Sequence, residues 1–339
     1  MSLPGITGSP AEPMSTNLTR LFAPLRRGKS LFGLLHHHPM PLATMLDHNL
    51  VHVRDLSLAE YGIFLLSGGL YLVLLLRLHA VGSYRFRIRG STARPAQMGR
   101  ELFNSTRAFV IYNALQIAMR IAALAAGYIL TFDVKMPLWE EALTFPLVIL
   151  VHDAYFYWTH WVMHWPPLFR SFHWEHHRSR QPTVLTAHSF AVGESLVHGA
   201  FPILYAIFFP CTFATLIFFY VVMIVHDVAI HSGVELFPPL LVTDRRFGWW
   251  CGTTHHDIHH AIGRTNYALY FRFWDRLMKT EHPQFERVYA YVRSPENDGQ
   301  AYRLLSRNER TMRPPSTGSA PIGSRLSDAA AGAALEPMA

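Results

Sequence analysis

Cysteine and charged residues are both scarce in this 339-residue sequence. The two cysteines, Cys211 and Cys251, cannot build a disulfide framework and lack zinc-finger spacing. Their scarcity also argues against an iron–sulfur site, so a metal centre here would use histidine and carboxylate ligands. Charged residues make up 16% of the chain, below the roughly 25% of ordinary soluble domains. With its long apolar runs, this composition predicts an integral membrane protein rather than two soluble domains.

Two further features are missing. No stretch interleaves basic and aromatic residues over a polar platform, so the net charge of +7 does not indicate nucleic-acid binding. We expect this surplus of arginine on the cytoplasmic side of a membrane instead. Residues 1–20 have no basic start followed by an apolar core and do not predict a cleaved secretory signal.

Long apolar segments predict an all-α helical bundle with about four to five membrane spans. The last of them contains Pro202 and Pro210 and exceeds 30 residues, so a helical hairpin explains it better than one straight helix. A hairpin also returns the chain to its starting side and places the histidine-rich segments on one face. The apolar segments are residues 61–78, 108–132, 138–165 and 199–231.

The two ends of the chain differ in composition from its middle. Residues 1–56 are expected to be a partly disordered or interfacial segment, and residues 57–310 the membrane domain. Residues 311–339 are rich in Pro, Ser, Ala and Gly and predict a disordered tail. Basic residues before the first apolar segment prevent the positive-inside rule from placing the N-terminus.

Histidine is the most informative residue type, with 21 in the chain. An HxxxH motif at 160–164 is followed by HxxHH at 173–177 and again at 256–260. Residues three and four apart share a helix face, so each triplet is expected to point three imidazoles at one locus. Neutral imidazole is a good ligand for divalent iron or zinc. The candidate ligands are His160, His164, His173, His176, His177, His226, His231, His256, His259 and His260.

These candidates exceed the needs of one ion. A tetrahedral metal takes about four ligands and an octahedral one about six, so the set predicts two metals with open positions. His226 and His231 are the weakest pair, because five residues turn an ideal helix so that the side chains diverge by about 140°. Both can be ligands only if the helix ends or bulges between them. His152, His188 and His255 could bind metal or orient the ligands.

Acidic residues flank the motifs, and a carboxylate often accepts a hydrogen bond from the second nitrogen of a ligating histidine. Glu175 and Asp257 lie on the opposite side of their triplets by helical angle. For these two, a surface acid is the simpler interpretation. The flanking acids are Asp153, Glu175, Asp227 and Asp257.

Taken in order, these motifs resemble the fatty acid hydroxylase / sterol desaturase superfamily. The matching text is HDAYFYWTHWVMH, FHWEHH, HSGVELFP and HHDIHHAIGRTNYALYFRFWDRLMKTEHP, all within residues 140–283. The resemblance implies a helical membrane protein with a cytoplasmic cap carrying a histidine-ligated dimetal centre. It also implies catalytic and ligating roles for nine of the ten candidate histidines. The tenth, His226, is implied only as a metal ligand, and less firmly.

The same resemblance implies oxygen-dependent hydroxylation or desaturation of a membrane lipid, with two iron ions and O2 as co-substrate. A sterol-like polycycle, a fatty acyl chain and an aminolipid such as ornithine lipid all stay open as substrates. The chain has no Gly-rich flavin or dinucleotide fingerprint and no added haem domain, so we expect a separate ferredoxin- or cytochrome-type electron donor. The Ala- and Arg-rich composition favours a bacterial inner membrane.

Two other classes of protein place many histidines in a membrane. A metal-binding or transport protein without oxygenase activity would carry its ligands mid-membrane along several spans, whereas these cluster at predicted span ends. A bis-histidine haem protein needs isolated pairs facing across a bundle rather than triplets within single turns.

Overall fold

The computed structural model describes residues 58–70, 86–90, 93–125, 136–209 and 211–305, and single residues 55, 73 and 77. The predictions for residues 1–54 and 306–339, and for parts of the first two apolar segments, lie outside these ranges. In the described part of the chain the structure is helical, with isolated β-bridges and no strand. The predicted all-α class is therefore confirmed.

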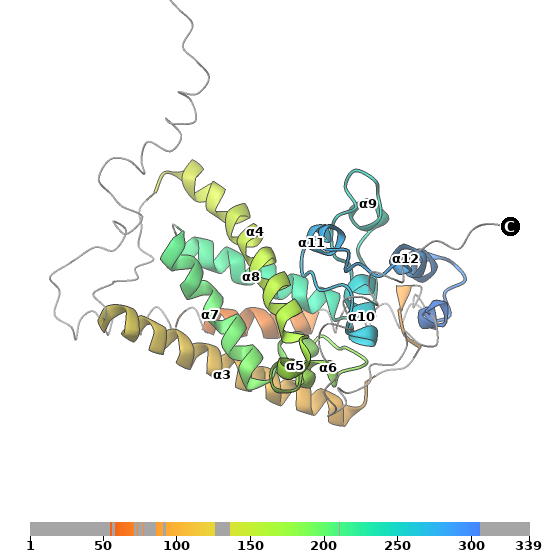
Figure 1. Cartoon of the computed structure of the whole chain (residues 1–339), viewed down its shortest axis with the longest axis horizontal. Coiled ribbons are helices and arrows are strands. Elements are labelled where there is room, and N and C mark those ends of the chain that lie inside the picture. The colour runs from red at the N-terminus through yellow and green to blue at the C-terminus, as the bar shows by residue number, and fades with distance from the viewer. Residues whose placement is uncertain are drawn as a thin grey trace, which may run out of the picture.

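Four long helices form the left part of the view in Figure 1. α3 (Pro95–Ala125) packs along α7 (Val192–Phe208), and α4 (Leu138–Met163) packs against both α7 and α8 (Phe213–Ile230). α7 and α8 diverge from the point where they join, in the shape of a V. The predicted break of the last apolar segment into two helices is confirmed, although Pro202 stays inside α7.

One helix among the described residues, Phe213–Ile230, is long and apolar enough to cross a membrane by length and composition. The helices Leu58–Leu70 and Val192–Phe208 are apolar but shorter. The second and third predicted spans fall in α3 and α4, helices of 31 and 26 residues. The number of spans stays a prediction.

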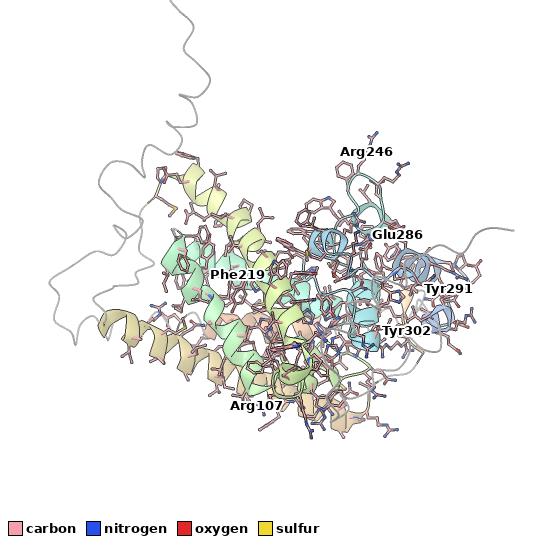
Figure 2. The ribbon with its side chains drawn as sticks, in the orientation of Figure 1. Arg107, Phe219, Arg246, Glu286, Tyr291 and Tyr302 are labelled. Carbon is pink, nitrogen blue, oxygen red and sulfur yellow. The ribbon has the colours of Figure 1, made fainter. Side chains whose placement is uncertain are left out.

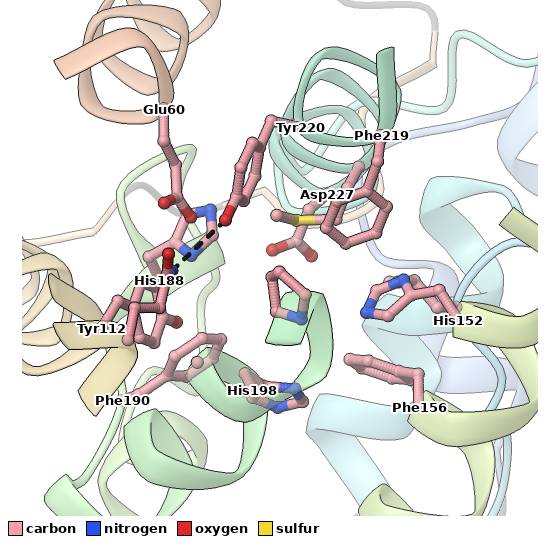
Figure 3. A pocket seen from close by; sticks show the side chains of 15 residues that line it. Glu60, Tyr112, His152, Phe156, His188, Phe190, His198, Phe219, Tyr220 and Asp227 are labelled. Atoms are coloured by element: carbon pink, nitrogen blue, oxygen red, sulfur yellow. Dashed lines mark hydrogen bonds between the residues drawn. The ribbon is translucent and has the colours of Figure 1, made fainter. Parts of the chain in front are cut away.

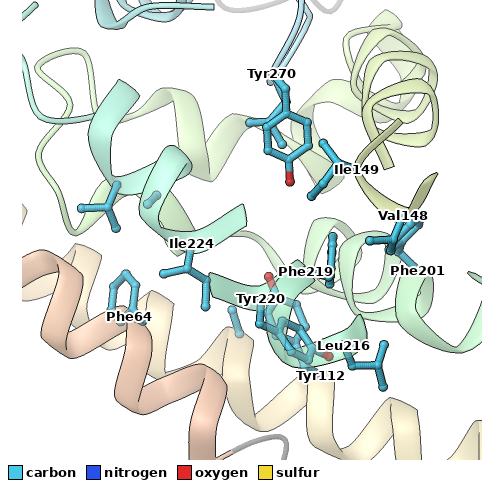
Figure 4. Close-up of a cluster of buried hydrophobic side chains, with 14 of the residues drawn as sticks. Phe64, Tyr112, Val148, Ile149, Phe201, Leu216, Phe219, Tyr220, Ile224 and Tyr270 are labelled. Carbon is cyan, nitrogen blue, oxygen red and sulfur yellow. The ribbon is translucent and has the colours of Figure 1, made fainter. Parts of the chain in front are cut away.

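Aromatic and aliphatic side chains fill the space between the long helices (Figure 4). The rings of Phe201 on α7 and Phe219 on α8 have centroids 5.1 Å apart. α7 approaches α3 closely at Gly199, where a Cβ atom would lie 2.7 Å from the ring of Tyr112. These contacts pack α7 against α8 and α3, and the histidine motifs lie at or beyond the ends of α4 and α8.

Short elements connect α4 to α7 and follow α8, and those that follow α8 form the right part of Figure 1. α10 carries the second HxxHH motif on one face and Ile258 on another, where it joins an apolar cluster with Val288 and Val292 of α12. This alternation explains why a histidine-rich helix still packs on a core. The short elements are α5 (Pro166–Phe172), α6 (Trp174–His177), η3 (Thr186–His188), α9 (Pro239–Val242), α10 (Thr253–Ile262), α11 (Phe273–Leu277), α12 (Phe285–Arg293) and η4 (Ala301–Leu304).

Both ends of α10 are set by specific contacts. A carboxylate oxygen of Glu235, in the loop after α8, accepts a hydrogen bond from the backbone N–H of Thr254 at 2.7 Å. Gly252 precedes the helix, where a Cβ atom would lie 2.8 Å from that carboxylate. The helix ends at Gly263, whose positive φ of 69° lets its N–H return to the carbonyl of His259. The position of the second triplet is therefore tied to the end of α8.

Candidate metal centre

Nine of the ten candidate histidines lie in two neighbouring clusters of ring nitrogens. Within each cluster, one nitrogen from every ring lies within 4.8 Å of the others. All the rings are buried except that of His164, which is partly exposed. The first cluster contains His160, His164, His173, His177 and His259, and the second contains His176, His231, His256 and His260.

Each HxxHH triplet divides between the two clusters, so the expectation of one locus for each triplet was wrong. His256 and His260 belong to the second cluster, while His259 belongs to the first. On an ideal helix, positions i and i+4 are about 40° apart, whereas positions i+3 and i+4 are about 100° apart. One turn of α10 therefore presents imidazoles to two adjacent sites. The triplet at 173–177 divides in the same way.

The ring nitrogens face one another at short distances. The Nε2 atom of His177 lies 3.0 Å from that of His259 and 3.2 Å from that of His164. In the second cluster, the Nε2 atoms of His231 and His256 are 2.9 Å apart. Nitrogen ligands at about 2.1 Å from one ion lie roughly 3.0–3.4 Å from each other. The spacings match the edges of a coordination shell in both clusters.

Hydrogen bonds on the outer side of the rings decide which nitrogen carries a lone pair. Nδ1 of His259 donates to the carbonyl of Thr265 at 2.7 Å, and Nδ1 of His231 donates to the carbonyl of Asp227 at 2.7 Å. Because a carbonyl only accepts, Nδ1 carries the hydrogen in both rings, and Nε2 is the atom left to offer a lone pair to an ion in the cluster. Facing lone pairs repel unless a cation lies between them, so the donor set fits a bound metal ion.

Glu194 is a supporting residue that the sequence analysis missed. Its Oε1 atom accepts a hydrogen bond from Nδ1 of His173 at 2.6 Å, and both side chains are buried. The Nε2 atom of the same ring lies 2.9 Å from Nε2 of His160, whose Nδ1 donates to the carbonyl of Tyr267. A carboxylate in this position fixes the orientation of a ligand ring and raises its basicity. The sequence signal that could have identified Glu194 is its position as the one acidic residue in the first turn of an apolar helix.

Burial lowers the pKa of three cluster histidines, and these three lie outside the long helices. For His176, His177 and His259 the pKa lies well below its ordinary value of 6.5, because burial removes water from the charged ring and neighbouring imidazoles repel it. The rings therefore stay neutral near pH 7, which is the form that binds metal ions.

His226 lies outside both clusters. Its Nε2 atom donates a hydrogen bond to the carbonyl of Leu269 at 2.8 Å. α8 ends at Ile230 with His231 as its C-cap, so the helix does end between the two residues, but only His231 reaches a cluster. Also outside the clusters are His152, His188 and His255.

Asp257 does not lie on the surface, contrary to expectation. It is buried, and its carboxylate oxygens lie 3.0 and 2.9 Å from nitrogens of Arg89. Tyr302, labelled in Figure 2, also contacts this carboxylate. Asp257 does face away from the clusters as its helical angle requires, but that side of α10 meets residues 86–90 and η4 rather than water. Glu175 is partly exposed and pairs with Arg178 at 2.7 Å.

The other two flanking acids support backbone and ligand. Asp227 places a carboxylate oxygen 3.2 Å from Nδ1 of His231. Asp153 accepts hydrogen bonds from the backbone N–H groups of Tyr270 and Phe271 at 3.0 and 3.2 Å. Of the four flanking acids, only Asp227 therefore makes the predicted contact between a carboxylate and the second nitrogen of a cluster histidine.

Comparison with known proteins bears on the same segment. Residues 145–280, which include all nine cluster histidines, match the family model described as fatty acid hydroxylase. Over this segment the chain resembles the fatty acid hydroxylase / sterol desaturase superfamily. The resemblance inferred from the motifs is thus confirmed.

The curated relatives of this chain are similar over the same region. Cholesterol 25-hydroxylase of Rattus norvegicus is 33% identical over 135 residues, 40% of this chain and 45% of the relative. Cholesterol 25-hydroxylase of Homo sapiens is 34% identical over 133 residues, covering 39% and 48%. Methylsterol monooxygenase erg25A of Aspergillus fumigatus is 36% identical over 148 residues, covering 41% and 48%. The chain spans about half the length of the curated relatives it matches. No solved structure matches it.

Proposed function

We propose that this protein is a membrane-bound oxidoreductase that hydroxylates or desaturates a lipid at a C–H bond. It uses two iron ions, O2 and electrons from a separate ferredoxin- or cytochrome-type protein. The observation that carries the proposal is the pair of imidazole clusters, of five and four rings, inside a fatty acid hydroxylase segment.

The two clusters are close enough to act as one centre. The rings of His177 in the first cluster and His260 in the second have centroids 4.9 Å apart. Five and four nitrogen ligands leave open positions in shells of about six. When bound, a pair of iron ions supplies the reduction of O2 that cleavage of an unactivated C–H bond requires.

The chain's own residues hold and enclose this centre. Glu194 and the carbonyls of Thr265 and Tyr267 orient the ligand rings through Nδ1, as described above. The ring of Phe156 packs 5.1 Å from that of His160, and the ring of Phe190 packs 5.3 Å from that of His176. These aromatic side chains exclude water from the side of the centre that faces the long helices.

A lipid substrate and a membrane location are supported by the outer surface. Large apolar side chains such as Phe103 on α3, Leu150 on α4 and Phe208 on α7 are exposed. Exposed apolar surface on long helices suits contact with lipid. The arginine-rich sequence at 85–107 supports a cytoplasmic position for the metal centre. Since the similar proteins are named for cholesterol and methylsterol, a sterol-like lipid is the first substrate to test.

The test combines metal analysis with lipid analysis. The purified full chain should contain two non-haem irons and show no Soret band in its optical spectrum. Lipids of cells that express the gene, with iron and a reductant supplied, should show a species heavier by one oxygen or lighter by two hydrogens. An iron-loaded protein that leaves all lipids unchanged under these conditions contradicts the oxidoreductase proposal.

A further inference from the structure

A buried cavity lies among the long helices (Figure 3). It is bounded by the helix Leu58–Leu70 and by α3, α4, α7 and α8. Phe156 and Phe190 line it and also pack on cluster histidines, so one layer of side chains separates the cavity from each cluster. A lipid that reaches the centre from the long helices meets this cavity.

One side of the cavity carries polar atoms that the described residues do not satisfy. His188 and Tyr112 line it and are only 2% and 3% exposed. Among the described residues, no hydrogen-bonding partner contacts either ring nitrogen of His188. The hydroxyl of Tyr112 also has no partner among them. Burying such atoms unpaired is costly, so three of them at one cavity indicate a partner that is not among the described residues. Figure 3 shows Glu60 beside them.

Most of the exposed wall is apolar, although Gln116, His152, His198 and Asp227 also line the cavity. Phe219, Met223 and Leu269 line the cavity, with Phe156 on the side away from His188. A mostly apolar cavity with a few convergent polar groups is the usual form of a small-molecule site. The centre of a water molecule can occupy about 30 Å³ of it, which is space for about two water-sized groups. That space suits one polar group of a lipid and not its whole hydrocarbon.

We propose that this cavity binds the hydroxyl group of a lipid substrate, with Tyr112 and His188 as its hydrogen-bonding partners. The inference rests on the proposed function and adds the substrate class, a hydroxyl-bearing lipid. A neutral imidazole offers one donor and one acceptor, and a phenol offers both, which matches the donor and acceptor of an alcohol. Binding the hydroxyl here places the carbon that bears it next to Phe156 and Phe190, one layer of side chains from the metal centre.

The test measures lipid binding by the purified, iron-loaded full chain in detergent. Radiolabelled cholesterol is competed with cholest-5-ene, which lacks the hydroxyl, and radiolabelled octadecanol is competed with octadecane. For at least one pair, the alcohol should bind about tenfold more tightly, as expected for one or two hydrogen bonds to a buried site. Tyr112→Phe and His188→Phe should each reduce that preference to about twofold or less without changing the iron content.

The control is Tyr205→Phe. It removes a buried hydroxyl on α7 that does not line this cavity. It should keep the full preference for the alcohol. If His188→Phe does not fold, Tyr112→Phe alone carries the test. Equal binding of alcohol and hydrocarbon in both pairs, or an unchanged preference in Tyr112→Phe, would mean that the cavity holds water only and overturns the proposal. If the protein oxidises a lipid but binds alcohol and hydrocarbon equally well, only this inference is contradicted. If it binds the alcohol more tightly but oxidises no lipid, only the proposed function is contradicted.

Discussion

Arg89 forms an ion pair with Asp257 through two nitrogen–oxygen contacts of 3.0 and 2.9 Å, although the two residues are 168 positions apart in the sequence. Asp257 sits between His256 and His259, which belong to different clusters. The pair therefore sets the rotation of α10 about its axis, which decides where both imidazoles point. Tyr302 closes the contact by bonding to both partners.

Asp257→Asn should lower the stability of the protein and its iron content together. Removing one charge of a largely buried pair costs about 2–3 kcal/mol, because Arg89 keeps its charge without a counterion. A rotated α10 then weakens both sites. Thermal unfolding and iron analysis check this. Glu175→Gln is the matched control, since this acid also lies inside a triplet but is partly exposed, and it should retain two irons. Full iron loading in Asp257→Asn would contradict the role given to the pair.

Single ligand variants should separate the two sites. His177→Ala removes a ligand from the first cluster and His256→Ala from the second, so each is expected to retain roughly one iron per chain and to lose lipid oxidation by about 100-fold or more. His226→Gln should bind two irons, because Gln can still donate a hydrogen bond to the carbonyl of Leu269. Iron analysis of the three purified proteins distinguishes these outcomes. Loss of iron from His226→Gln would return that residue to the ligand set.

Glu194→Gln should weaken metal binding without unfolding the chain. The neutral amide can still accept from His173 but no longer raises the basicity of its ring. Loss of such a partner typically reduces metal affinity by about 10–100-fold. Competition with a chelator measures the change, and Glu141→Gln, remote from the clusters, serves as the control. An affinity equal to that of the wild-type protein would show that the contact is incidental.

Acid should destabilise the metal-free protein. The pKa of His176, His177 and His259 is lowered by burial in the folded state, so the unfolded chain binds more protons at mildly acidic pH. Stability therefore rises with pH in that range. This contribution is complete above the ordinary pKa of 6.5 and is lost as the pH falls below it. Thermal unfolding between pH 5 and 8 tests the sign, and a melting temperature that rises on acidification would refute it.

Local spacing predicted much of the centre. HxxxH and HxxHH place side chains on one helical surface, and this periodicity is a property of a few adjacent residues. It was sufficient to select eight of the nine cluster histidines, whereas His231 lies in neither motif and formed the weakest pair with His226. It could not show that the i+3 histidine of each triplet faces a different cluster from the i and i+4 pair.

The sequence by itself determined the helical class, the break between α7 and α8, and which side chains could serve as ligands, since all of these follow from local pattern and composition. Only the tertiary structure decided that Glu194 supports His173 and that Asp257 is buried against Arg89. It also decided that His188 and Tyr112 share one cavity. Such contacts join residues far apart in the chain, and their formation depends on how whole helices pack rather than on any spacing within one of them.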